Sequence, residues 1–204
     1  MDIAILLDGD YTRRMIKRRI GRNPSYVELE QFCRLCIQRD ERIVKAYYYD
    51  CPPFGEIRKL PVSGCEKNFS YDPVYQKALA FQKELSQQRF FTFRKGTLSF
   101  DGWKIKEDSM KELILKHRML RDDDFDPVLT QKQVDMKIGL DIATISLKRS
   151  LPKILLATAD ADFIPAIHFG RSKGLEVILI SDGHSTLKIK AELIKSCNGH
   201  RIIQ

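Results

Sequence analysis

The sequence predicts an α/β protein in which helices flank a mainly parallel sheet. Three short apolar runs, at residues 3–7, 153–157 and 176–180, have the length and composition of fully buried strands. Two segments with helical periodicity, at residues 131–147 and 163–173, alternate with the later runs. Because alternating strands and helices pair the strands in parallel through crossover connections, the pattern predicts a sheet covered on both faces.

Further strand and helix signals extend this pattern. Residues 42–49 are expected to form a second strand, rich in tyrosine toward its end. Ser25 is the expected N-cap of a helix over residues 26–38, with Glu28 completing a capping box. The expected C-terminal elements are a short helix at residues 187–194 and a last strand near Arg201.

The middle of the chain is less regular. We expect a single domain over residues 1–204, with an insertion at about residues 55–126. Residues 73–87 predict a helix, and residues 90–106 predict a hairpin-like stretch that turns near Gly96 or Gly102. The acid-rich residues 121–127 are expected to form a solvated loop rather than a metal site.

Charge and hydropathy restrict the class of partner. The 204 residues carry a formal charge of +8, with a pI near 9.2, which favours an anionic partner such as nucleic acid. No apolar run approaches the length that spans a membrane, and the apolar start at residues 1–7 is too short for a signal-peptide core. We therefore expect a cytoplasmic protein without a membrane partner.

The five cysteines are an odd number and suggest reduced thiols rather than a disulfide framework. Cys33 and Cys36 have CxxC spacing, and Cys51 and Cys65 could complete a zinc site. The interpretation we favour is that Cys33 and Cys36 pack as small apolar groups within the helix at residues 26–38.

Acidic residues follow the predicted strands. Asp8 ends the first apolar run, and Asp160 and Asp162 follow the strand at residues 153–157. Ligands of parallel sheets bind beyond the carboxyl ends of the strands, so these carboxylates are expected to face one crevice if the two strands are neighbours. Asp135 would join them from the helix at residues 131–147.

Such a cluster of carboxylates favours a divalent cation. Like charges raise one another's pKa, and Mg²⁺ or Mn²⁺ would relieve the repulsion because these ions prefer hard oxygen ligands. This arrangement suits phosphodiester hydrolysis. Taken singly, Asp162 could instead cap the following helix, Asp8 and Asp10 could form a turn, and Asp135 could be a surface acid of its helix.

Four segments occur in the order seen in one known family: residues 8–11 (DGDY), 46–50 (AYYYD), 132–141 (KQVDMKIGLD) and 158–165 (TADADFIP). At these residues the chain resembles the NYN family of PIN-like metal-dependent nucleases, in particular its LabA-like branch. The resemblance spans most of the chain outside residues 55–126. It implies a PIN-like, Rossmann-like α/β fold and a divalent-metal-dependent nuclease.

The resemblance also implies roles for individual residues. The expected metal-binding catalytic acids are Asp8, Asp135, Asp160 and Asp162. Positions that could support them are Asp10, Asp141 and Thr158. Asp141 falls on a stripe of apolar residues, where an acid needs a partner. Expected contacts to nucleic acid are Arg13, Arg14, Lys17, Arg18 and Lys132.

The expected activity is therefore a ribonuclease, an endoribonuclease in the first instance, that uses Mg²⁺ or Mn²⁺ and binds RNA. RNA and DNA, endo- and exonucleolytic action, and a homo-oligomer are all compatible with the sequence. One alternative is a catalytically inactive nucleic-acid-binding or regulatory module. Another is a haloacid-dehalogenase-like phosphatase, because Asp8, Asp10 and Thr12 fit a D-x-D-x-T motif with Asp8 as nucleophile.

Overall fold

The computed structural model describes residues 1–183 and 189–203, and the chain divides into two compact units. The first unit comprises residues 1–50, 81–96 and 133–204, and the second comprises residues 51–80 and 97–132. The first unit contains one six-stranded sheet, and the second contains two two-stranded sheets.

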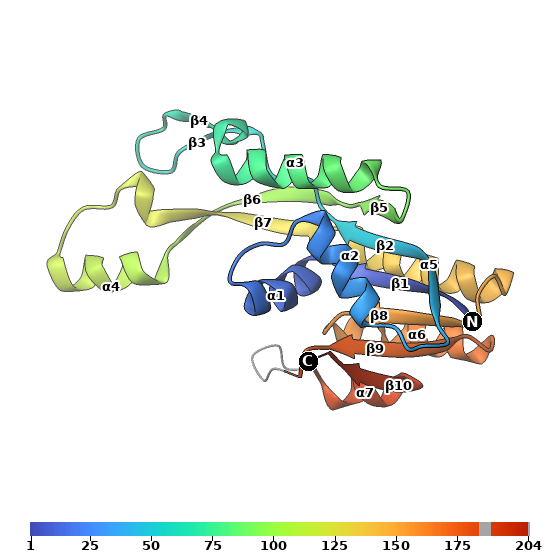
Figure 1. The fold of residues 1–204 in the computed structure, drawn as a ribbon. Helices are drawn as coiled ribbons and strands as arrows, with labels where there is room; N and C mark the ends of the chain where they lie inside the picture. The colour runs from blue at the N-terminus through green and yellow to red at the C-terminus, as the bar shows by residue number, and fades with distance from the viewer. Residues whose placement is uncertain (184–188, 204) are drawn as a thin grey trace. The chain divides into compact units, whose positions relative to one another are not determined.

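A six-stranded parallel sheet forms the centre of the first unit, in the order β10-β9-β8-β1-β2-β5 (Figure 1). Its strands are β1 (Asp2–Asp8), β2 (Arg42–Asp50), β5 (Phe91–Lys95), β8 (Lys153–Ala157), β9 (Glu176–Ser181) and β10 (Gly199–Ile202). The α/β class with a mainly parallel sheet is thus confirmed. The chain adds β2 and β5 on one side of β1 and β8, β9 and β10 on the other, so the strand order reverses between β1 and β8.

Helices cover both faces of this sheet (Figure 1). The helices are α1 (Gly9–Ile20), α2 (Tyr26–Leu35), the end of α3 (Pro73–Gln87), α5 (Val134–Lys148), α6 (Ile164–Ser172) and the short α7 (Ala191–Ser196). On one face Ile5 and Leu7 pack in a buried cluster with Met15 of α1 and Leu29 of α2. Helix α5 contacts β1 and β2 and packs beside α6, which contacts β9.

Two local signals produce the expected helix boundaries. Glu28 accepts a hydrogen bond from the Ser25 backbone N–H at 2.8 Å, which confirms the predicted capping box of α2. Gly21 ends α1 in a left-handed conformation with φ of 75°, which a glycine adopts without steric cost. Helix α1 begins directly after β1 and carries the basic residues from Arg13 to Arg18.

The predicted hairpin at residues 90–106 is wrong. Residues of β5 pair in parallel with β2, from Ala46 opposite Phe91 to Asp50 opposite Lys95, and the following strand β6 (Thr97–Ile105) pairs with β7 (Phe125–Lys132). Gly96 does separate β5 from β6, but the two strands do not pair with each other. Gly102 lies at an irregularity of the β6–β7 ladder with φ of 103° and makes no turn. The glycine marked a bulge, which is the other common use of glycine in strands.

Three other boundaries differ from expectation. The predicted loop at residues 121–127 contains a short 3-10 helix, η2 (Asp122–Asp124), and the start of β7, and its Asp124 is buried rather than solvated. Helix α5 begins at Val134, because Gln133 adopts a left-handed conformation and the residues before it belong to β7. The helix expected from Leu187 begins at Ala191; Leu187 itself lies outside the described residues.

The second unit is built on the antiparallel β6–β7 ribbon. Its other elements are β3 (Ile57–Lys59) paired with β4 (Glu66–Asn68), the 3-10 helices η1 (Phe69–Tyr71) and η2, the first half of α3, and α4 (Glu107–Lys116). Its aromatic side chains pack on one another: Phe54 stacks on Phe100 with ring centroids 5.6 Å apart, and Trp103 lies 5.6 Å from Phe100. The strands of this ribbon and α4 were not individually predicted.

The structure bears on two expectations from the sequence, one for the cysteines and one for membrane-spanning helices. All five cysteines are free, and Cys33 and Cys36 are buried in the core of the first unit, which confirms that they pack as apolar groups. Cys65 is exposed, whereas Cys33, Cys36 and Cys51 are buried. Over the described ranges, no cluster of three or more His, Cys, Asp or Glu side chains could hold a metal ion. None of the helices in the described part of the chain is long and apolar enough to cross a membrane.

Candidate active site

Asp8 lies where β1 runs directly into α1, and it is both the last residue of the strand and the N-cap of the helix. Its Oδ1 accepts a hydrogen bond from the backbone N–H of Tyr11 at 3.3 Å. Its Oδ2 accepts one from the hydroxyl of Thr158 at 3.1 Å. Both oxygens of this carboxyl group are therefore oriented by neighbouring donors at the carboxyl end of the central strand.

The surroundings of Asp8 raise the pKa of its carboxyl group. Burial raises its pKa from an ordinary 3.8 to about 6. The hydrogen bonds from Tyr11 and Thr158 favour the charged form and limit the rise, whereas the charges of Asp10 and Asp135 add to it. A carboxyl group with this pKa can exchange a proton near physiological pH.

The turn after β8 connects Asp8 to the next two acids. The hydroxyl oxygen of Thr158, a residue with no exposed surface, also accepts a hydrogen bond from the backbone N–H of Asp160 at 3.2 Å. Oδ1 of Asp160 in turn accepts from the backbone N–H of Asp162 at 2.9 Å. Asp160, not Asp162, is therefore the N-cap of the 3-10 helix η3 (Ala161–Phe163) that leads into α6.

Asp135 approaches the same region from the first turn of α5, and η3 is in contact with α5. Its pKa is raised, first by burial and then by the negative charges of Asp160 and Asp162. Asp135 in turn raises the pKa of Asp8. The predicted acids thus lie around the carboxyl ends of β1 and β8, at the reversal point of the sheet, which is the place where such sheets bind ligands.

The chemistry of this donor set fits a hard divalent cation. All four side chains offer carboxylate oxygens. Burial is the main reason that the pKa of Asp8 and Asp135 is raised, and a bound cation would relieve the repulsion between acids that adds to it. Among the described residues, no three acidic, His or Cys side chains are grouped in a way that could hold an ion. The assignment of these four acids to a metal site therefore stays a prediction.

The other acids expected near the site have partners of their own. Asp10 is an exposed residue of the first turn of α1 and pairs with Arg14 at 2.6 Å. Asp141 receives two hydrogen bonds from Arg94 of β5, at 2.7 and 2.8 Å, and one from the hydroxyl of Tyr49 at 2.8 Å. The acid on the apolar stripe of α5 is therefore explained by an ion pair with the edge strand of the sheet.

Most of the basic residues expected to contact nucleic acid are also in ion pairs. Arg13 pairs with the buried Asp50 at the end of β2, and Arg18 pairs with Asp182 at 3.2 Å. Lys17 is exposed and has no ion-pair partner among the described residues. Lys132 is the last residue of β7, in the second unit.

Asp182 is an acid of this edge that the sequence analysis missed. It follows β9 directly, its side chain is 4% exposed, and its charge acts on the buried Tyr11, one helical turn from Asp8. The signal was present, because an apolar strand that ends in an acid is the pattern that identified Asp8.

Comparison with known proteins identifies the family. A family model described as the NYN domain matches residues 2–204, essentially the whole chain. The chain belongs to the NYN domain family. This is a family of PIN-like nucleases, which agrees with the parallel sheet and with the acids at its reversal point.

Among solved structures, this NYN domain is similar to a crystal structure of a protein of unknown function from Vibrio parahaemolyticus. The similarity has a TM-score of 0.55 at 17% sequence identity and covers 100% of this chain and 93% of the other. At this level of identity the similarity concerns the fold alone. No curated protein matches the NYN domain chain.

Proposed function

We propose that this NYN domain is a divalent-metal-dependent ribonuclease whose catalytic acids are Asp8, Asp135, Asp160 and Asp162. The observation that carries the proposal is the hydrogen-bonded path from Asp8 through Thr158 to Asp160, which joins the carboxyl ends of β1 and β8. The nuclease class of the family and the charge of +8 support a nucleic-acid substrate.

In this proposal the four carboxylates would hold Mg²⁺ or Mn²⁺, which when bound supplies an activated water and neutralises charge on the phosphate. Thr158 orients the carboxyl group of Asp8 by hydrogen bonding. In the metal-free protein the pKa of Asp8 is about 6, so its carboxyl group is mostly ionised at neutral pH and available to bind the cation. Asp135 and Asp160 approach one another from α5 and the β8 turn, so their repulsion favours cation uptake.

The test is cleavage of labelled single- and double-stranded RNA and DNA with Mn²⁺, Mg²⁺ or chelator. We expect the parent protein to cleave RNA, and Asp160→Asn to lower the rate by about a hundredfold or more. Asp40→Asn is the matched control, because Asp40 is an exposed acid that precedes β2 and lies away from the carboxyl ends of the strands. Full activity in Asp160→Asn, or equal loss in both variants, would refute the assignment.

Metal uptake is measured separately by electron paramagnetic resonance of added Mn²⁺. We expect saturable binding by the parent and by Asp40→Asn, and weakened binding by Asp160→Asn. This readout does not depend on having chosen the right nucleic acid. Saturable binding that Asp160→Asn leaves unchanged would assign the ion to other residues.

A second candidate, a nucleic-acid-binding module without cleavage, is favoured by one observation. The described residues contain no group of three acids already arranged around an ion. RNA affinity without cleavage under either metal, together with no Mn²⁺ binding, would establish this candidate in place of the nuclease.

A further inference from the structure

The two units differ sharply in charge. The second unit, residues 51–80 and 97–132, contains eleven Lys and Arg and eleven Asp and Glu residues, so its formal charge is zero. The entire charge of +8 therefore belongs to the first unit. Since nucleic-acid affinity depends on counterion release by basic side chains, a neutral unit is a poor surface for a phosphate backbone. Its exposed features are better suited to a protein partner.

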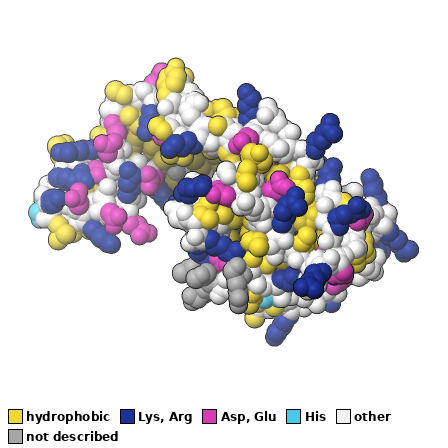
Figure 2. Space-filling view, viewed as in Figure 1, with side chains coloured by type: hydrophobic (Ala, Val, Ile, Leu, Met, Phe, Trp, Pro, Cys, Tyr) yellow, Lys and Arg dark blue, Asp and Glu magenta, His cyan; other side chains and the backbone are white. Residues whose placement is uncertain are grey.

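Helix α4 is the exposed feature of this unit. None of its residues is buried. Met110, Ile114 and Leu115 have 45%, 66% and 80% of their surfaces exposed, and Met119 just after the helix is 87% exposed. At the position of α4 in Figure 1, Figure 2 shows hydrophobic side chains at the surface between charged ones. A ten-residue helix without burial is marginal in water, so a covering partner would stabilise it.

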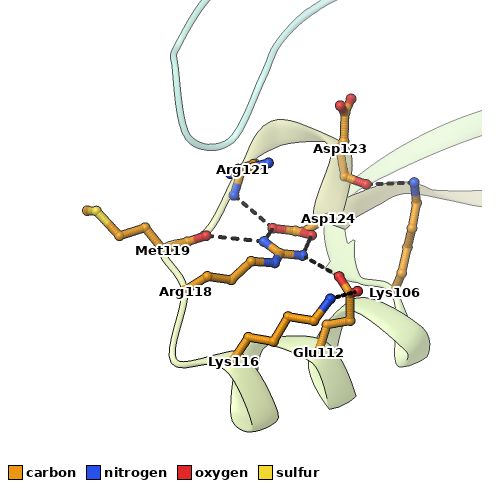
Figure 3. A network of polar contacts seen from close by, with 8 residues as sticks. All are labelled: Lys106, Glu112, Lys116, Arg118, Met119, Arg121, Asp123 and Asp124. Atoms are coloured by element: carbon orange, nitrogen blue, oxygen red, sulfur yellow. Dashed lines mark hydrogen bonds and ion pairs between the residues drawn. The ribbon is translucent and has the colours of Figure 1, made fainter.

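Polar residues before and after α4 attach it to η2 (Figure 3). Arg118 donates to the buried Asp124 at 2.7 Å and pairs with Glu112 of α4 at 3.3 Å. Asp124 also accepts from the backbone N–H of Arg121 at 2.8 Å, and the ammonium group of Lys106 donates to the backbone carbonyl of Asp123 at 2.7 Å. The contacts of this network are made by charged and backbone groups, and the apolar side chains of Met110, Ile114 and Leu115 remain exposed.

The charge along α4 is complementary to itself in the antiparallel direction. Its first turn carries Glu107 and Asp108, and its last turn carries Lys116, which also pairs with Glu112 of the same helix at 2.6 Å. In a two-fold pair of antiparallel helices the acidic start of one lies beside the basic end of the other, at both ends. We infer that α4 pairs with α4 of a second copy of this chain, burying Met110, Ile114 and Leu115. The inference does not depend on the proposed nuclease activity.

Sedimentation velocity of the full chain tests this pairing. The helix is short, so we expect a weak dimer that forms between about 1 and 100 µM. Ile114→Asp should weaken dimerisation at least tenfold, about the loss of one central apolar contact. Val74→Asp is the control, because Val74 of α3 is 75% exposed and lies outside α4. Circular dichroism and thermal unfolding establish that both variants fold. A monomeric parent, or equal behaviour of the two variants, would overturn the pairing.

A charge exchange tests the antiparallel arrangement. Lys116→Glu alone and Glu107→Lys alone should each weaken self-association, because each places like charges together at both ends of the pair. A mixture of the two variants should restore the dimer, since positions 107 and 116 of the two chains then carry opposite charges at both ends of the pair. A mixture that remains monomeric would overturn the antiparallel pairing.

Discussion

The hydroxyl group of Thr158 donates a hydrogen bond to Oδ2 of Asp8 at 3.1 Å, and thereby joins β8 to β1 at their carboxyl ends. The same hydroxyl oxygen accepts from the backbone N–H of Asp160. One buried side chain thus fixes the relative position of two proposed catalytic acids. A hydroxyl is needed there, because only a group that donates and accepts at once can satisfy both neighbours.

Thr158→Val should therefore impair the site without removing an acid. The change leaves a carboxylate oxygen and a backbone N–H without their partner, which we expect to cost about 1–3 kcal/mol of unfolding free energy. Because the hydrogen bond lowers the pKa of Asp8, that pKa should rise above its present value of about 6. The acidic limb of the cleavage pH profile should move to higher pH. Thr158→Ser, which keeps the hydroxyl, should leave the limb in place.

Asp8→Asn should separate stability from activity. The folded carboxyl group has a pKa of about 6 against an ordinary 3.8, so the folded state binds more protons between these values. Stability therefore decreases as the pH rises from about 4 to about 6, and the penalty is complete above that range. Asn cannot ionise and still accepts hydrogen bonds, so the metal-free variant should exceed the parent in stability at neutral pH by up to about 3 kcal/mol.

The measurement is urea unfolding of both proteins in chelator. The difference should vanish near pH 4, at about the ordinary carboxyl pKa. Asp40→Asn should match the parent throughout. A stability difference that does not change with pH would contradict the assignment of the raised pKa to Asp8.

The sequence predicted the sheet, and the acids at the ends of its strands, because both depend on short-range patterns. An apolar run followed by an acid indicates a strand end, and parallel strands place such ends at one edge. This reasoning found Asp8 and Asp160 from β1 and β8. It could equally have found Asp182 after β9, where the same pattern occurs.

Contacts between residues that are distant in the sequence were not predicted, because they depend on which strands pair. Asp141 is bound by Arg94, 47 positions earlier in the chain, and that contact exists only because β5 pairs with β2. Predicting a hairpin for this segment removed Arg94 from the sheet. Likewise, nothing in the sequence distinguishes Asp124 from the neighbouring surface acids, whereas in the structure Arg118 pairs with it. Adjacent charges in a sequence do not reveal which of them is buried.

Glu41 provides a test of stability away from the site. Its side chain is fully buried, Arg201 of β10 donates to both of its oxygens at 2.6 Å, and Lys153 of β8 donates at 3.1 Å. These hydrogen bonds hold the pKa of Glu41 at about 2, below the ordinary 4.5. The stabilisation is therefore present above pH 4.5 and is lost as the pH falls toward 2.

Glu41→Gln should lower the unfolding free energy by about 3–5 kcal/mol at neutral pH, because two cations lose their buried counter-charge. The loss should diminish in acid, where the parent also becomes protonated. Glu30→Gln is the control, since the exposed pair of Glu30 and Arg34 should contribute at most about 1 kcal/mol. Equal effects of the two substitutions in thermal and urea unfolding would show that the buried network contributes no more than a surface pair.

Lys17 tests where nucleic acid binds. Among the basic residues of α1 it is exposed and has no ion-pair partner in the described part of the chain, whereas Arg13, Arg14 and Arg18 are paired with acids. A free cation can release counterions when it meets a phosphate, so Lys17→Ala should weaken RNA binding and reduce the salt slope of log affinity by about 1. Stability should be unchanged.

The matched substitution is Lys77→Ala, which removes an exposed lysine from the neutral second unit. Fluorescence anisotropy across a salt series, in chelator so that no cleavage occurs, should give the parent slope for Lys77→Ala and a smaller one for Lys17→Ala. Reversal of these results would assign RNA binding to the second unit. Because the first unit alone carries net positive charge, we expect the slope to depend on Lys17.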